Sequence, residues 1–498
     1  MLKRTINNFI LLTLIISFFI VFVFPIQSAK KQSIKGKTTL IKKTKPKSTS
    51  KISKSKPQAK SKVTKSKSLT STKVTKSKKK KKLQPYVSEI VFDTLLADGI
   101  KYYNQVMGRG RRLHSIHVIE TNIEKNPHSL EIIKGQDLSN ELERLSEMMS
   151  RFSQTEKSDI AGAVNGNFWR AYKNYPIGPV VVNGEIVEMN KYKEWSSGFF
   201  DKKSRIFVDN FQLSCSLTLI KGNSIEIETV NRRRDTSGNV MYNRFGGKQI
   251  PFIEESNLKK KIDDAVNEFM QDSIFTDSTE ISFEIEKLKK EIISSELANK
   301  VEFSLKKISL KYLTLPMINK EIKCTVIGID TGAVSIPADG FIVTIGTNDK
   351  QIDMPSIGDT VILHAKTNRV NAIPFLNAIS GTPRLVRNGL AKHEAYYEGS
   401  KGRRFIYKQL PRTAIGTNRS MTKLYLVGIA ANGVKPGNIG ASLAELANIM
   451  KSVGCFNAMN LDGGGSSGMF IGGRNVLRHS ETGLFRKISV GLAIIKNK

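Results

Sequence analysis

Cysteine is scarce in this chain, which has three cysteines among its 498 residues: Cys215, Cys324 and Cys455. An odd count leaves at least one thiol unpaired, so disulfide bonds are not the framework of the fold. The sequence has no C-x-x-C pair and no Cys/His spacing that is typical of zinc sites. We therefore expect the three cysteines to be buried as small hydrophobic side chains.

Acidic residues are missing from the first 88 residues, which contain 24 Lys and Arg and no Asp or Glu. The formal net charge of the chain is +35, so +11 is left for the other 410 residues. A charge of +35 by itself suggests a nucleic-acid-binding protein. Because most of it lies in the N-terminal segment, the rest of the chain is only mildly basic.

Apolar residues are few in the Lys/Ser/Thr-rich segment 30–82, where "KVTKSK" occurs at 62–67 and again at 73–78. Such a segment cannot bury enough apolar surface to offset its chain entropy, and its like charges repel. We expect residues 30–83 to form a disordered tether. It either adheres to an anionic surface, such as a membrane or wall polymer, or is a solvated spacer.

Long hydrophobic runs are limited to residues 9–24, an almost unbroken apolar stretch that follows Lys3 and Arg4. Pro25 ends the run, and Ser28 and Ala29 are small residues that suit cleavage. Residues 1–29 are therefore predicted to be a signal peptide or, if uncleaved, a membrane anchor at 9–24. The protein would then be exported to the extracellular space, the cell surface or a periplasm, where we expect no nucleic acid partner.

The remainder, residues 84–498, has the pattern of an α+β fold with twisted, largely antiparallel sheets flanked by helices. Asn183-Gly184 lies between two apolar runs and predicts a hairpin. Ser442 and Glu445 have the spacing of a capping box, with Gly454 as the expected helix end. Apolar residues at helical spacing predict a helical insertion at about 254–319.

The segment "NLDGGGSSGMF" at 460–470 has the G-x-G-x-x-G spacing of dinucleotide-binding loops. Those loops open a helix, whereas here Gly472-Gly473 lies between apolar residues and predicts a hairpin. A Walker loop is excluded because the segment has no lysine. Consecutive glycines can direct backbone N–H groups at an anion. Asp462 either caps this turn or acts beside the anion.

Five stretches together resemble the phosphodiester glycosidase family. They are "AVNGNFW" at 163–169, "AISGTPRLVRNG" at 378–389, "PRTAIGTN" at 411–418, "NAMNLDGGGSSGMFIGGRNV" at 457–476 and "FRKISVGLAII" at 485–495. They follow the order of the family, and the resemblance covers about residues 87–495. Thr382, Asn167 and Trp169 stand where the family usually has other residues.

The resemblance implies hydrolysis of a sugar-1-phosphodiester to a free sugar and a phosphomonoester. Phosphate leaves as a stable anion, so one carboxylate with phosphate-binding groups could suffice where other glycosidases need two carboxyl groups. The implied catalytic residues are Asp462 as base or nucleophile, with Arg412 and Arg486 holding the phosphate. His364, His393 and His479 are candidate acids or bases by residue type alone, and His479 lies nearest the closing motif.

The other residues that the resemblance implies would bind the sugar or the phosphate. They are Asn165, Gly166, Phe168, Thr413, Gly463, Gly464, Gly465, Ser466 and Ser467. No cofactor is expected, and a divalent cation near Asp462 has no support from the sequence. The alternative is a non-catalytic glycan- or wall-binding surface protein that uses its basic tether. The sequence indicates no oligomeric state.

Overall fold

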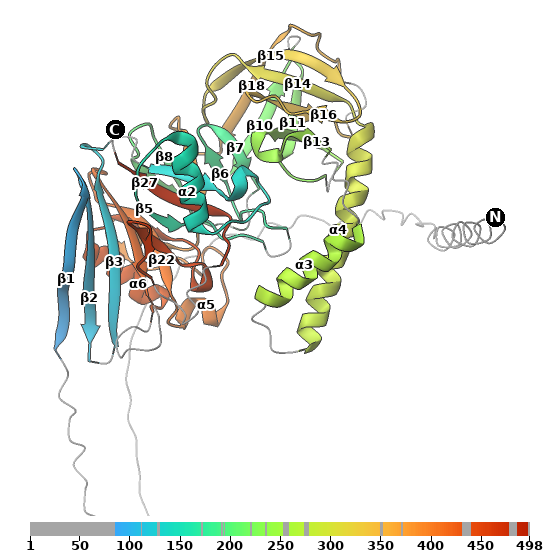
Figure 1. Ribbon diagram of the computed structural model, residues 1–498. Helices are drawn as coiled ribbons and strands as arrows, with labels where there is room; N and C mark the ends of the chain where they lie inside the picture. Colours follow the sequence, from blue (N-terminus) through green and yellow to red (C-terminus); the bar gives the residue numbers. More distant parts are fainter. Residues whose placement is uncertain are drawn as a thin grey trace, which may run out of the picture. The chain divides into compact units, whose positions relative to one another are not determined.

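In a computed structural model, the chain is described from residue 85 to residue 496, with short gaps. The gaps are 111, 127–129, 171–172, 191–192, 194, 220–221, 235–236, 252–257, 273–277, 349–351, 370–371, 431–439 and 478–485. The expected signal or anchor and the expected tether lie outside the described residues and stay predictions. The expected α+β class with largely antiparallel sheets is confirmed (Figure 1).

The largest sheet has eight strands, and each pairs antiparallel with its neighbours. Its strands in spatial order are β1 (Tyr86–Ala97), β2 (Ile100–Arg109), β3 (Arg112–Asn122), β23 (Lys423–Ile429), β22 (Arg412–Thr417), β24 (Asn457–Asn460), β20 (Arg384–Arg387) and β21 (Leu390–Ala391). Helix α6 (Leu443–Val453) lies against β20, β21 and β22, and its Leu446 and Met450 belong to the core that also contains Val118 and Val427 of this sheet. The short helix α5 (Arg403–Tyr407) contributes Ile406 to the same core.

A second antiparallel sheet has five strands. In spatial order they are β26 (Arg474–Asn475), β25 (Met469–Ile471), β5 (Ile160–Asn165), β27 (Val490–Ile495) and β4 (Leu130–Lys134). Helix α2 (Leu145–Glu156) packs Leu145 and Met148 against it, and a 3₁₀ turn at Gly135–Asp137 precedes that helix. The expected hairpin at Gly472-Gly473 is confirmed as the β25–β26 turn.

A third antiparallel sheet also has five strands. In spatial order they are β7 (Glu185–Glu188), β6 (Val180–Val182), β19 (Asn377–Ser380), β8 (Ser197–Phe200) and β9 (Ile206–Asp209). The expected β6–β7 hairpin is confirmed, and φ is positive at both Asn183 and Gly184. This conformation is the one that a tight hairpin turn requires and that the Asn-Gly pair favours.

The chain between β9 and β19 contains a closed barrel of seven strands. In spatial order they are β10 (Leu213–Thr218), β11 (Ser224–Val230), β12 (Asn239–Asn243), β17 (Gly340–Thr344), β14 (Lys307–Tyr312), β15 (Glu321–Asp330) and β18 (Thr360–Thr367). The pairing of β10 with β18 closes the barrel, and β11–β12 is its parallel pair. A 3₁₀ turn (Arg244–Gly246) and a ribbon of β13 (Gln249–Ile250) with β16 (Val334–Ser335) adjoin it.

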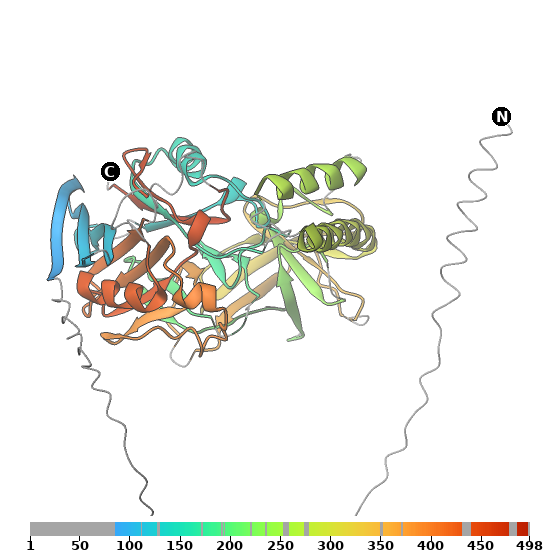
Figure 2. The same ribbon diagram turned by 90° about the horizontal axis from the view of Figure 1, so that it is seen from below.

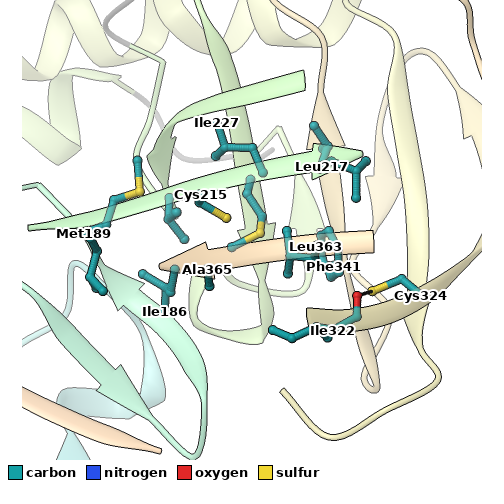
Figure 3. Packing of buried hydrophobic residues seen from close by; sticks show 14 of the residues in the cluster. Ile186, Met189, Cys215, Leu217, Ile227, Ile322, Cys324, Phe341, Leu363 and Ala365 are labelled. Atoms are coloured by element: carbon teal, nitrogen blue, oxygen red, sulfur yellow. Dashed lines mark hydrogen bonds between the residues drawn. The ribbon is translucent and has the colours of Figure 1, made fainter. Parts of the chain in front are cut away.

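Alternate side chains of the barrel strands point into a hydrophobic core (Figure 3). Cys215 and Cys324 both lie in this core (Figure 3). In the strand register, Cys215 pairs with Ala365 of β18 and Cys324 pairs with Val361 of the same strand. Cys455 is buried under α6 instead. All three cysteines are buried and unpaired, as expected from the sequence.

The segment of the expected helical insertion, about residues 254–319, contains two helices and a barrel strand. Helices α3 (Leu258–Asp272) and α4 (Ser278–Ser304) lie side by side (Figure 2). Residues 307–312, which fall inside the expected range 254–319, form barrel strand β14 instead. The segment "KISLKY" places Ile308 and Leu310 toward the barrel core, and this alternation favours a strand.

Candidate active site

Asp462 lies two residues after β24, in the loop that links β24 to β25. Its backbone N–H donates to the Gly166 carbonyl at 3.0 Å, which joins the loop to the end of β5. Its carboxylate accepts the Gly463 N–H at 2.8 Å and a hydrogen bond from the Ser466 side chain. Burial raises the pKa of Asp462 to about 6, while these hydrogen bonds and the charge of Arg486 act in the opposite direction. Asp462 is half-buried and therefore still accessible.

Asn165, the last residue of β5, holds this loop in place. Its Nδ2 donates to the Asp462 carbonyl at 2.8 Å. Its Oδ1 accepts the Thr413 hydroxyl at 2.6 Å and the Gly468 N–H at 3.0 Å. Asn165 and Thr413 are both fully buried, so their side chains are committed to the loop. The expected sugar contact of Asn165 and the expected substrate or phosphate contact of Thr413 stay predictions, and the hydrogen bonds favour a positioning role for both residues.

Gly166 is required by close packing, because a Cβ there would lie 3.0 Å from the Val490 carbonyl oxygen. Its N–H donates to that same oxygen at 2.7 Å. Gly166 therefore fixes the distance between β5 and β27 beside the site, and its binding role stays a prediction.

Most backbone N–H groups of the glycine loop are used inside the chain. Those of Gly463, Gly464, Ser466, Ser467 and Gly468 donate to oxygens of Asp462, Pro411, Gly463, Gly464 and Asn165. The 3₁₀ turn Gly464–Ser466 forms part of this loop. The expected phosphate-binding role of the loop stays a prediction. Because the other N–H groups already donate inside the chain, the N–H of Gly465 is the candidate phosphate donor of this loop, since it is not among these internal donors.

Arg412, the first residue of β22, is a buried cation with 1% of its surface exposed. Its Nε donates to the Ala441 carbonyl at 2.9 Å, and its Nη2 donates to the carbonyls of Phe405 and Lys408. Nη1 lies 4.0 Å from the position that a Cβ would take at Gly463. Within the described part of the chain no carboxylate is ion-paired with Arg412, and burial lowers its pKa to about 10. The loop thus faces a guanidinium that has no carboxylate partner among the residues that the structure describes.

Aromatic side chains surround these groups. Phe168 packs edge-on against Trp195 and Phe405, with ring centroids 5.4 and 6.1 Å away. Phe405 also contacts the Arg412 guanidinium, 5.4 Å from its ring centroid. The Arg486 guanidinium lies 5.9 Å from the Trp169 ring centroid. Phe168 therefore lies beside the proposed catalytic groups, where its expected contact with substrate stays a prediction.

Two aromatic residues near the site could not be selected from the sequence. Phe405 and Trp195 lie outside the quoted motifs, and their contacts with Phe168 depend on the tertiary fold. His393 is half-buried, and burial together with the charge of Arg412 lowers its pKa. Of the three candidate histidines, His393 thus lies near Arg412, whereas His364 lies on barrel strand β18 and His479 lies outside the described residues.

Thr382 and Arg384 mark the stretch where the sequence departs from the family pattern. The Thr382 hydroxyl and the Arg384 N–H both donate to the buried carboxylate of Glu398, at 2.8 and 2.7 Å. This stretch is thus tied to the loop that carries Glu398. Across the described ranges, no three His, Cys, Asp or Glu side chains lie close enough together to hold a metal ion.

Comparison with family models gives a match over the last third of the chain. Residues 324–495 match the phosphodiester glycosidase family. The resemblance expected from the sequence is thereby confirmed. The phosphodiester glycosidase match includes Arg412, Thr413, Asp462 and Arg486, whereas Asn165 lies ahead of it in the sequence. A comparison with curated proteins found no match.

Two solved structures share the fold at low sequence identity, and a third gives a match with a TM-score below 0.5. A hypothetical protein from Synechocystis is 17% identical with a TM-score of 0.53, and the match covers 80% of this chain but only 62% of that one. A protein of Burkholderia pseudomallei K96243 that is proposed to be exported is 15% identical, with a TM-score of 0.52 and coverage of 83% and 98%. The catalytic domain of zebrafish N-acetylglucosamine-1-phosphodiester alpha-N-acetylglucosaminidase, auto-inhibited by its pro-peptide, gives 13% identity, a TM-score of 0.33 and coverage of 84% and 85%.

Among the described residues, no helix is both long enough and apolar enough to cross a membrane. Residues 9–24, the expected signal or anchor, lie outside the described residues.

Proposed function

We propose that this protein hydrolyses a sugar-1-phosphodiester and releases the free sugar and a phosphomonoester. One arrangement carries the proposal: the half-buried carboxyl group of Asp462 lies in a loop that faces the Arg412 guanidinium at Gly463 and is within reach of the charge of Arg486. Burial raises the pKa of this carboxyl group to about 6. Arg486 is close enough to act on the charge of Asp462, and Arg412 is buried without a carboxylate partner in the described chain. The family match supports the same reaction class.

The two arginines suit the phosphate of such a substrate. A guanidinium matches the oxygens of a phosphate group and is more strongly bound to them where water is excluded. Arg412 has Nε and Nη2 fixed by carbonyls, which leaves Nη1 to face the glycine loop. In this proposal Arg412 and Arg486 hold the phosphate and stabilise the negative charge that it gains as it leaves.

Asp462 then acts on the anomeric carbon of the sugar. As a base it would take a proton from the attacking water, and as a nucleophile it would form a glycosyl ester that water cleaves. In both routes the bond between the anomeric carbon and oxygen breaks, and its electron pair stays on the phosphate. A pKa of about 6 leaves Asp462 largely ionised at neutral pH, as both roles require.

The proposed substrates are glycans of the cell surface or the extracellular space. The N-terminal charge and apolar run of residues 1–29 support export. One structural neighbour is itself proposed to be exported. The basic segment 30–82 would hold the protein near an anionic membrane or wall polymer.

A non-catalytic glycan-binding protein is the second candidate. The buried Arg412 without a carboxylate partner in the described residues could bind a phosphate group without any chemistry. Both candidates predict binding of a glycan phosphodiester, but only the first predicts product release.

The test is incubation of the purified chain with a UDP-sugar and with GlcNAc-1-phosphodiester, followed by an assay for free reducing sugar. The Asp462→Asn variant is the control, since it keeps the shape of the side chain and removes the base. Release by the native chain and none by the variant supports the proposal. No release across several sugars by a folded protein contradicts it.

A further inference from the structure

Three tyrosines next to the candidate site expose large aromatic surfaces to solvent. Tyr396, Tyr397 and Tyr407 have 57%, 77% and 58% of their surfaces exposed. We call this group the tyrosine platform. A group of exposed aromatic rings commonly marks a binding surface, because exposed rings contribute little to the hydrophobic core that stabilises the fold.

The loop that carries Tyr396 and Tyr397 is fixed by a buried carboxylate. Glu398 accepts hydrogen bonds from the Ser196 N–H and hydroxyl, at 3.1 and 2.5 Å, besides those from Thr382 and Arg384. Buried polar groups that are fully bonded rigidify their surroundings. Ala395, also fully buried, anchors the other side of the loop. The platform is therefore held in place before any ligand arrives.

The two halves of the platform are joined to each other. The hydroxyl of Tyr396 lies 2.5 Å from that of Tyr407, which belongs to α5. Arg403 of the same helix is close enough for its charge to act on the Tyr396 phenol. The loop and α5 thus present one surface rather than two independent groups.

Positive charge surrounds the tyrosines. The platform lies on two segments, the loop at residues 392–401 and the segment at 403–408 that contains α5. Five cations in these segments are exposed: Lys392, Lys401, Arg403, Arg404 and Lys408. None of them has an ion-pair partner within the described residues. The acidic residues nearby are already engaged, because Glu394 pairs with Arg387 at 2.6 Å and Glu398 is buried. The surface therefore favours an anionic ligand.

Both segments of the platform also reach the candidate site. On α5, Phe405 contacts Phe168 and the Arg412 guanidinium. In the other segment, His393 is close enough to Arg412 for the guanidinium to lower its pKa. A ligand that extends from the site would therefore meet the platform.

We propose that the tyrosine platform binds further sugar units of an anionic, phosphate-bearing polysaccharide, one of whose sugar-1-phosphodiesters is cleaved at Asp462. The apolar faces of sugar rings stack on the tyrosines, while the exposed cations contact phosphate groups along the chain. This inference rests on the proposed function for its reaction. It identifies the substrate as a polymer rather than a small nucleotide sugar.

The binding test uses phosphomannan, with the same mannan freed of phosphate as the control ligand. The protein is the full chain with Asp462→Asn, so that the ligand is not consumed. We compare Tyr396→Ala/Tyr397→Ala and Arg403→Ser/Arg404→Ser with two matched controls. These are Tyr86→Ala, an equally exposed tyrosine on β1, and Lys202→Ser/Lys203→Ser, an exposed basic pair.

Both platform variants are expected to bind phosphomannan about tenfold more weakly, the tyrosine variant because it loses aromatic stacking and the arginine variant because it loses two cations. The two control variants are expected to bind like the parent, and mannan without phosphate is expected to bind weakly. Equal binding by all variants would overturn the inference. Tighter binding of the single-stranded RNA poly(U) than of phosphomannan would overturn it in favour of nucleic acid.

A second measurement separates this inference from the proposed function. With Asp462 intact, the tyrosine variant is expected to lose kcat/KM on phosphomannan but to keep it on the methyl diester of mannose-1-phosphate. Equal losses on both substrates would overturn the platform role while the hydrolase stands. If no substrate is cleaved but the variants still lose phosphomannan binding, the hydrolase fails and the platform remains as a binding surface.

Discussion

At the residue scale, the candidate site brings together one acid with a raised pKa, two cations, and polar residues whose hydrogen bonds hold the loop. The Asn165 amide forms hydrogen bonds with the backbone and with Thr413, and two of the three guanidinium nitrogens of Arg412 donate to carbonyls. The sequence motifs contain both residues, yet a motif alone does not separate a group that contacts substrate from one that positions its neighbours. That difference is visible only in the hydrogen bonds.

The pKa of Asp462 predicts how activity depends on pH. Because the ionised carboxylate is needed, kcat/KM should rise as pH increases through about 6 and level off near neutrality. Ser466→Ala removes a hydrogen bond that lowers this pKa, so the midpoint should move to higher pH. A profile that is flat from about pH 4.5 to pH 8 would contradict the assignment of Asp462.

The same raised pKa has a consequence for stability. The folded state favours protonated Asp462, so this group takes stability away as pH rises from the unfolded value near 4 through about 6. Asp462→Asn removes that penalty, and its Tm at neutral pH should equal or exceed that of the native chain. Thermal unfolding of both proteins at pH 5 and pH 7 measures this difference in Tm. A clearly lower Tm for Asp462→Asn than for the native chain at neutral pH would count against the raised pKa of Asp462.

Replacement of Arg412 should lower both catalysis and anion binding. For Arg412→Lys we expect kcat/KM to fall by about 100-fold or more, since an ammonium cannot bond the three carbonyls and still face the loop. Inorganic phosphate should also inhibit the variant less strongly. Arg387→Lys, in an exposed ion pair with Glu394, is the control and should behave like the native chain. Normal kinetics for Arg412→Lys would refute the phosphate role.

Asn165 and Thr413 should act as one unit in stability. Asn165→Ala leaves a buried hydroxyl, a backbone N–H and a carbonyl without their partner, which should cost about 2–3 kcal/mol. Thr413→Val removes the same hydroxyl bond, so the double variant should lose less than the sum of the single losses. Urea unfolding measures all four proteins, and strictly additive losses would show that the two side chains are not coupled.

At the scale of elements, the sequence correctly predicted turns and helix caps that depend on residues close together in the chain. Asn183-Gly184 forms its hairpin, and Ser442 with Glu445 caps α6, which ends at Gly454 with φ of 114°. The closed barrel could not be predicted in this way, because its closure pairs Leu213 with Thr367 across a long stretch of chain. The hydrogen-bond partners of Arg412 could not be predicted either, because they are carbonyls of α5 and of Ala441, which the tertiary fold brings to Arg412.

The glycine loop allows a matched comparison of two neighbouring positions. Gly464 has φ of 62°, whereas Gly465 does not have a positive φ, and a Cβ at either position would meet no atom within 4 Å. Gly464→Ala should therefore destabilise the protein by about 1 kcal/mol and disturb the loop, while Gly465→Ala should be nearly neutral in stability. Equal effects on Tm would contradict the backbone reason given for Gly464.

At the scale of the whole molecule, the strongly basic composition and the candidate site belong to different parts of the chain. The first 88 residues hold 24 of the 79 Lys and Arg and none of the 44 Asp and Glu. The family match begins only at residue 324, although Asn165 and Phe168 of the first half contribute to the same site. The reaction is therefore expected to depend on residues outside the family match, such as Asn165 and Phe168, as well as on those within it.

The central claim is that cleavage takes place at the sugar carbon rather than at phosphorus. Hydrolysis of a GlcNAc-1-phosphodiester in ¹⁸O-labelled water, with mass analysis of the phosphomonoester, tests this claim most directly. The account predicts a phosphomonoester without ¹⁸O, because water oxygen joins the sugar when the bond between the anomeric carbon and oxygen breaks. Incorporation of ¹⁸O into the phosphomonoester would show attack at phosphorus and would contradict the account.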